Sequence, residues 1–230
     1  MYIAGLEKNS FVDYPGQIAA VVFTPYCNYD CFYCHNREII EHPREDLGEE
    51  MVFKYLQKRR AMLDAVVVSG GEPTMQKDLK AFIEKVKAMG FLVKLDTNGS
   101  NPEVLQTLLD DKLLDFVAMD YKAPLDRYEE ICGKGVSSEP FLQCVDILKA
   151  SGIDYELRTT FVPQLAPKDI EQMLKAIAPV KRYALQAYRQ PATYKKEDRF
   201  RIHAKPHAPS VFTEAAALCE PYAEAVFVRK

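Results

Sequence analysis

Three cysteines lie within eight residues in the segment CNYDCFYC, at positions Cys27, Cys31 and Cys34. Thiols grouped in this way are typical of metal or redox sites. Three thiolates on one loop can hold three irons of a cubic 4Fe–4S cluster and leave the fourth iron open to a reacting molecule. Zinc is the alternative, with His35 as a fourth ligand. However, His35 directly follows Cys34, and adjacent residues are awkward ligands for one tetrahedral ion.

A second group of polar residues follows the predicted strand at 64–71, in the segment SGGEP. Gly70 and Gly71 allow a backbone edge to approach a ligand closely. Glu72 adds a carboxylate, and Pro73 stiffens the exit from the turn. An exposed strand edge beside a carboxylate would suit the ammonium group of an amino acid. Alone, such a turn is weak evidence, but beside the cysteine loop it indicates a ligand site.

The elements that must position these motifs alternate along the chain between strand and helix. Apolar runs predict strands at 18–24, 64–71, 91–99, 114–122, 153–163 and 183–190, with an edge strand at 224–230. Amphipathic patterns predict helices at 48–60, 78–90, 102–111, 141–152, 169–180 and 209–223. This alternation predicts an α/β fold with a parallel sheet. We expect a partial (β/α)6 TIM-type barrel, because a closed barrel usually needs about 250 residues.

The composition is that of an ordinary globular protein, with 230 residues, 48% of them hydrophobic, and a net charge of −3. This balance gives no sign of a nucleic-acid footprint or a polybasic membrane patch, and no apolar run reaches the length of a membrane span. The N-terminal segment lacks the features of a signal peptide. We therefore expect one cytoplasmic domain over 1–230, with its core at about 16–190 and a C-terminal helix and edge strand in 209–230.

The two motifs together make the sequence resemble the radical S-adenosylmethionine superfamily. Cys27, Cys31 and Cys34 match its C-x3-C-x-aromatic-C motif, with Tyr33 as the aromatic residue, and residues 70–73 match its GGEP motif. The resemblance implies a 4Fe–4S cluster held by the three thiolates, with S-adenosyl-L-methionine on the open iron and its amino group near the GGEP turn. It also implies reductive cleavage of this cosubstrate to a 5′-deoxyadenosyl radical.

Further segments resemble the glycyl-radical-enzyme activating proteins of this superfamily: DYPG at 13–16, CHNR at 34–37, DTNG at 96–99 and DYK at 120–122. By that resemblance, Asp96, Thr97 and Asp120 would hold a monovalent cation beside the carboxylate of the cosubstrate, since hard oxygen ligands suit such a cation. Lys122 would contact the cosubstrate itself. Arg158, a looser match, would form a forked ion pair with its carboxylate.

The length of the chain and the phrase FVDYPG resemble the short activating proteins of anaerobic ribonucleoside-triphosphate reductase. The resemblance implies abstraction of a glycine hydrogen on a partner glycyl-radical enzyme, with an electron donor such as flavodoxin or ferredoxin. Two alternatives stay open. One is a radical enzyme acting on a small molecule or nucleobase precursor, and the other, from a different class, is a non-catalytic zinc-binding module.

The other cysteines are scattered singly along the chain. Cys144 and Cys219 lie in predicted amphipathic helices, where buried free cysteines are common. Cys132 lies in a loop, and we interpret it as a surface residue. Gln186 and Tyr188 end the sixth predicted strand, where such residues either touch a ligand or only pack.

Overall fold

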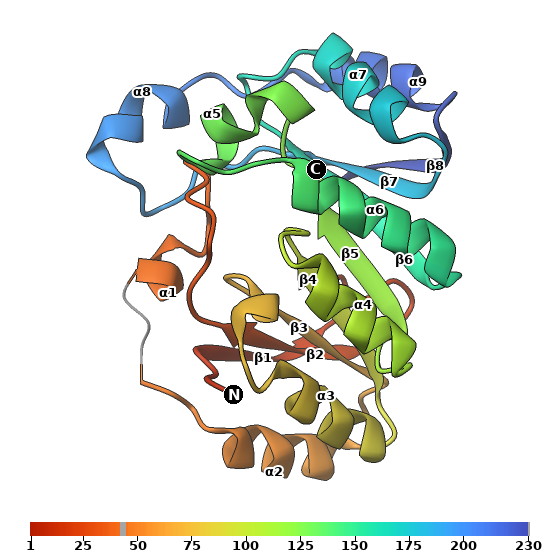
Figure 1. Ribbon diagram of the computed structural model, residues 1–230. Coiled ribbons are helices and arrows are strands. Elements are labelled where there is room, and N and C mark those ends of the chain that lie inside the picture. Colours follow the sequence, from red (N-terminus) through yellow and green to blue (C-terminus); the bar gives the residue numbers. More distant parts are fainter. Residues whose placement is uncertain (42–44, 230) are drawn as a thin grey trace.

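The computed structural model describes residues 1–41 and 45–229, and over these ranges eight strands form one sheet in chain order (Figure 1). They are β1 (Gly5–Ser10), β2 (Ala19–Thr24), β3 (Ala65–Gly70), β4 (Leu92–Thr97), β5 (Phe116–Asp120), β6 (Asp154–Phe161), β7 (Val180–Ala187) and β8 (Ala223–Arg229). β1 is antiparallel to β2, and each later neighbour pair is parallel. This parallel run confirms the predicted α/β, partial-barrel fold class.

The longer helices follow one another along the outside of the sheet, whereas α1, α5 and α8 lie at the left of the view in Figure 1. The helices are α1 (Arg37–Glu41), α2 (Glu49–Arg59), α3 (Leu79–Ala88), α4 (Pro102–Asp110), α5 (Tyr128–Cys132), α6 (Glu139–Ser151), α7 (Pro167–Ile177), α8 (Arg199–Ile202) and α9 (Pro209–Cys219). Among the helices in the described ranges, none combines the length and the apolar character needed to cross a bilayer.

Alternation along the strands separates two apolar clusters, one on each face of the sheet. On β3, Val66 and Val68 join the large core that includes the helices, whereas Ala65 and Val67 join a small cluster on the inner face. Tyr14, from the DYPG segment, is buried in this small cluster, and its ring centroid lies 5.6 Å from that of Phe116. The small inner cluster leaves the ends of the strands to polar side chains.

The first strand of the sheet differs from the sequence-based expectation. β1 was not predicted, since GLEKNS is polar and half of its residues are exposed. It is a strand because it pairs with β2, with Gly5 opposite Phe23 and Ser10 opposite Ala19, and such tertiary pairing commonly overrides local propensity. The predicted edge strand at the C-terminus is confirmed as β8; residue 230 of that prediction lies outside the described residues.

Candidate functional site

A cavity of about 440 Å³ lies where the parallel strands end, within the size range of small-molecule sites. Its lining includes eleven of the thirteen residues singled out from the sequence: Cys27, Cys31, Tyr33, Cys34, Gly70, Gly71, Asp96, Thr97, Asp120, Lys122 and Arg158. Glu72 and Pro73 are buried beside it. Gln186 also lines the cavity, whereas the buried Tyr188 hydroxyl donates to the Ile202 carbonyl at 2.8 Å.

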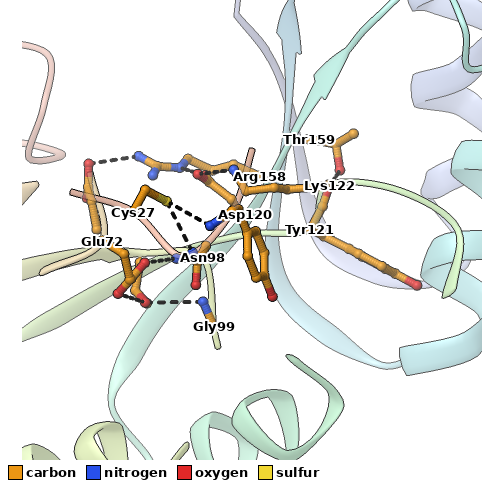
Figure 2. A network of polar contacts seen from close by, with 12 residues as sticks. Cys27, Glu72, Asn98, Gly99, Asp120, Tyr121, Lys122, Arg158 and Thr159 are labelled. Atoms are coloured by element: carbon orange, nitrogen blue, oxygen red, sulfur yellow. Dashed lines mark hydrogen bonds and ion pairs between the residues drawn. The ribbon is translucent and has the colours of Figure 1, made fainter. Parts of the chain in front are cut away.

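The cysteine loop leaves β2 through a strained residue. Tyr26 has a φ of 62°, in the left-handed region that non-glycine residues rarely adopt. Directly after it, the Cys27 sulfur accepts a long hydrogen bond from the Asn98 side-chain amide at 3.7 Å. Figure 2 shows Cys27 and Asn98 facing each other from two different strand ends. The loop is therefore tied to the end of β4 at its first cysteine.

Arg37 holds the middle of the same loop through hydrogen bonds. Its guanidinium donates to the Asp30 carboxylate at 2.8 Å and to the Cys31 carbonyl at 2.8 Å, and the side chain is almost fully buried. On the other side, the Arg201 guanidinium lies over the Phe32 ring, 3.8 Å from the centroid. The segment around α8 thus packs directly on the cysteine loop and fixes its position.

Cys132 corrects the sequence-based interpretation. It is fully buried at the end of α5, and its carbonyl accepts from the Asp30 amide at 2.7 Å. Interaction with the Cys132 side chain, together with burial, raises the pKa of the Cys31 thiol. The surface interpretation is wrong because α5 folds onto the cysteine loop. Cys144 and Cys219 are fully buried in α6 and α9, as predicted.

The glycine pair runs alongside the start of the cysteine loop. The Gly71 amide donates to the Thr24 carbonyl at 2.8 Å, and the Glu72 amide donates to the Tyr26 carbonyl at 2.8 Å. A Cβ atom at Gly71 would lie 1.8 Å from the Tyr26 carbonyl oxygen, so that only glycine allows this approach. The Asn36 amide closes the arrangement by donating to the Gly70 carbonyl at 2.6 Å.

The Glu72 carboxylate turns away from the cavity, whereas the sequence suggested that it stands beside the ammonium group of a ligand. It is fully buried and accepts from the Thr74 amide at 3.1 Å, the Thr97 hydroxyl at 2.8 Å and the Asn98 amide at 2.7 Å. Burial raises the pKa of Glu72, and these hydrogen bonds oppose the shift. The side chain joins the GGEP turn to the DTNG turn, and the backbone of the glycine pair faces the cavity.

In the same cavity, an ionic network crosses the ends of three strands (Figure 2). Arg158 bridges two carboxylates, with Nε 3.0 Å from an oxygen of Asp120 and Nη1 3.2 Å from an oxygen of Asp96. Lys122 Nζ lies 3.1 Å from the second Asp120 oxygen, and Lys94 forms an ion pair with Asp96. Burial alone would raise the pKa of Asp120, but Arg158 and Lys122 bring it down to about 2. Both aspartates are therefore charged at neutral pH.

The thiols behave as ligands that need a metal to ionise. Burial raises the pKa of Cys27 to about 12 and also raises the pKa of Cys34. Iron binding would therefore displace protons from these thiols. Over residues 1–41 and 45–229, no three His, Cys, Asp or Glu side chains lie close enough to hold a single metal ion. Thiols that share one cavity without converging fit a cluster, which spreads its ligands, better than one zinc ion.

Comparison with known proteins assigns the chain to a family. The family model of the radical SAM superfamily matches residues 21–177, which run from β2 to α7 and include both motifs. The chain belongs to the radical SAM superfamily. This radical SAM chain is 37% identical over 202 residues to a protein of Methanocaldococcus jannaschii that carries the provisional name of glycyl-radical enzyme activating enzyme. The alignment covers 85% of this chain and 83% of the relative.

Two further comparisons agree with that placement. The chain is 30% identical over 184 residues to the pyruvate formate-lyase-activating enzyme of Clostridium pasteurianum, covering 76% of this chain and 74% of the relative. The crystal structure of Streptococcus suis SuiB bound to S-adenosylmethionine has a TM-score of 0.65 at 14% identity, over 91% of this chain and 51% of that one. SuiB shows the fold alone, while the relatives confirm the resemblance to the activating group.

Membership of the superfamily implies a 4Fe–4S cluster and S-adenosylmethionine, and the residues of the cavity fit both. The three thiols stand on one loop that lines it, and the backbone of Gly70 and Gly71 borders it. Arg158 and Lys122 present cationic groups to the same cavity. This is a donor set for three irons, an ammonium group and a carboxylate.

Some residues of the site were not singled out from the sequence. Asn98 and Asn36, which join the cysteine loop to β4 and β3, stand inside the DTNG and CHNR motifs, so motif matching alone could have found them. Lys94 had a different signal. It precedes Asp96 by two residues on β4, and the two-residue period of a strand places both side chains on one face.

Proposed function

We propose that this radical SAM enzyme reductively cleaves S-adenosyl-L-methionine and removes a hydrogen atom from a glycine of a partner glycyl-radical enzyme. When bound, the cluster supplies the electron that breaks a C–S bond of the cosubstrate and yields a 5′-deoxyadenosyl radical. The observation that carries the proposal is one cavity lined both by three thiols and by the Asp96–Arg158–Asp120–Lys122 network.

The roles of the residues follow from where they lie. Cys27, Cys31 and Cys34 hold the cluster, and Tyr33, buried between two of them, fills the loop. The backbone edge of Gly70 and Gly71 accepts the cosubstrate ammonium group, while the buried Glu72 and Pro73 keep that edge in place. The protein therefore contributes orientation and charge, and leaves the redox chemistry to the cofactor.

The anionic end of the cosubstrate meets fixed positive charge. Arg158 and Lys122 both line the cavity and are both mostly buried. Burial strengthens their attraction for a carboxylate, since the local dielectric is lower than that of water. Asp120, which also lines the cavity, holds the two cations in place at 3.0 Å and 3.1 Å. These contacts pre-organise the site before the cosubstrate enters.

The partner we propose is the anaerobic ribonucleoside-triphosphate reductase, and the electron donor is a small carrier such as flavodoxin or ferredoxin. Support comes from the relatives, because one is named for activation of glycyl-radical enzymes and another for activation of pyruvate formate-lyase. Neither name specifies the reductase, so the partner rests on the FVDYPG resemblance.

The test begins with protein purified without oxygen and reconstituted with iron and sulfide. Dithionite and S-adenosylmethionine are added, and 5′-deoxyadenosine is measured together with iron per chain. We expect the wild type to form the nucleoside and Cys31→Ala to lose both iron and nucleoside. Cys144→Ala is the matched control, since that thiol is buried in α6 apart from the cavity lining, and it should retain both. A colourless wild-type protein that binds zinc would overturn the proposal.

The partner is tested separately by adding a purified anaerobic ribonucleotide reductase and recording the electron paramagnetic resonance of a glycyl radical. Nucleoside formation with no glycyl radical, and with modification of an added small molecule instead, would refute the partner and leave the cleavage chemistry intact.

A further inference from the structure

The two aspartates expected to bind a monovalent cation are already engaged by cationic side chains. One Asp96 oxygen is paired with Lys94 Nζ, and the other lies 3.2 Å from Arg158 Nη1. One Asp120 oxygen lies 3.0 Å from Arg158 Nε, and the other lies 3.1 Å from Lys122 Nζ. Each of the four carboxylate oxygens is therefore paired with a charged N–H donor, and none is free to bind a metal ion.

The third expected ligand, Thr97, is also committed elsewhere. Its hydroxyl donates to the buried Glu72 carboxylate at 2.8 Å and accepts from the Gly99 amide at 3.1 Å. Thr97 follows Asp96 directly on β4, so the period of the strand turns its side chain to the opposite face. The three oxygen ligands inferred from the family resemblance thus do not form a cation cage in this chain.

The local charge balance points the same way. Asp96 and Asp120 contribute two negative charges, whereas Lys94, Lys122 and Arg158 contribute three positive ones. Two other buried carboxylates lie nearby and are matched by their own partners: Glu72 is held by hydroxyl and amide donors, and Glu156 is paired with the Arg229 guanidinium. A metal cation would add to a positive excess, whereas a carboxylate ligand would cancel it.

Lys94 is unusual in its own right, because it is only 1% exposed. A lysine buried to this degree requires a charged or hydrogen-bonded partner. Its partner is Asp96, which also pairs with Arg158, so Lys94 acts on the cavity through Asp96. Lys94 does not line the cavity itself, and we therefore describe it as a positioning residue.

We propose that the Lys94 ammonium and the Arg158 guanidinium take the place of a monovalent metal ion at this site, so that the cavity receives a carboxylate without one. The identity of that carboxylate as the cosubstrate's rests on the proposed function. The inference that this site binds no metal ion is independent of the proposed function, since it follows from the side-chain contacts of Asp96 and Asp120.

The first experiment measures the binding of thallium(I), a spectroscopic substitute for potassium, by thallium NMR on the reconstituted wild-type protein. The protein is kept in tetramethylammonium buffer, with and without S-adenosylmethionine. We expect no saturable thallium binding in either state. We also expect less than about a twofold change in 5′-deoxyadenosine formation when potassium or sodium replaces tetramethylammonium. One saturable thallium site per wild-type chain would overturn the inference.

The second experiment uses Lys94→Met, which keeps the length of the side chain and removes its charge. This variant frees an Asp96 oxygen, so we expect it to gain a saturable thallium site and to need potassium for cleavage, with at least about a tenfold stimulation. Lys87→Met is the matched control, because Lys87 forms an ion pair with Asp115 that does not line the cavity. The control should behave as the wild type does. A folded Lys94→Met protein that still binds no thallium would contradict the proposal that the Lys94 ammonium takes the place of a metal ion.

The outcomes separate this inference from the proposed function. If the wild type forms no 5′-deoxyadenosine, the proposed function fails, and thallium binding still decides the question of the cation site. If Lys94→Met does not fold, the wild-type binding measurement decides it alone.

Discussion

The effect of replacing Glu72 by Gln on stability can be worked out directly from the hydrogen bonds of its carboxylate. One carboxylate oxygen accepts from the Thr74 amide, the Thr74 hydroxyl and the Thr97 hydroxyl, at 3.1, 2.5 and 2.8 Å, and the other accepts from the Asn98 amide at 2.7 Å. The glutamine oxygen can keep the first position. Its NH₂ group then faces the Asn98 N–H, and two donors meet in a buried site.

The expected loss of stability follows from that geometry. A buried amide left without an acceptor costs about 1–3 kcal/mol, and the three other bonds weaken because their acceptor is no longer charged. Relief of the buried charge offsets part of this loss. We therefore expect the free energy of unfolding to fall by about 2–3 kcal/mol. For a chain of this size, that corresponds to a melting temperature lower by roughly 4–12 °C.

The assay is urea unfolding of the cluster-free protein under anaerobic conditions, followed by circular dichroism. Glu84→Gln is the matched control, because this side chain is 52% exposed on α3 and its loss should change stability by less than about 0.5 kcal/mol. A Glu72→Gln protein as stable as this control would refute the assignment of Glu72 to the interior. Since Glu72 joins the GGEP and DTNG turns, the variant should also bind S-adenosylmethionine more weakly than the control does.

Two further predictions test the cavity. Gly71→Ala should lower stability by about 1–3 kcal/mol and reduce iron per chain, because the new Cβ would lie 1.8 Å from the Tyr26 oxygen. Gly5→Ala, whose Cβ would meet Phe23 at an ordinary 3.5 Å, should do neither. Burial opposes ionisation of Asp120, but Arg158 and Lys122 lower its pKa from 3.8 to about 2, so its contribution to stability is present above pH 4 and declines as pH falls from 4 towards 2. The difference in urea midpoint between wild type and Asp120→Asn should shrink between pH 6 and pH 3, and a constant difference would contradict this origin.

Much of this protein could be predicted from short segments of sequence. The spacing of Cys27, Cys31 and Cys34 and the glycine pair at 70–71 are local patterns, formed by residues that are close together in the sequence, and one sequence is enough to recognise them. The alternation of strands and helices could also be predicted, because the apolar residues of each element follow the period of a helix or a strand. From these two facts it followed that the motifs meet at the ends of parallel strands, where the structure places them.

What only the tertiary structure decided is which partner each polar side chain has. The sequence suggested that Glu72 contacts a ligand, yet donors from the neighbouring strand end enclose its carboxylate. Cys132 reads as a surface residue, yet α5 buries it against Cys31. Asp96 and Arg158 stand 62 residues apart. Pairings over such distances depend on the order of the strands and on how far each side chain reaches. Neither can be predicted from the two residues that form the pair.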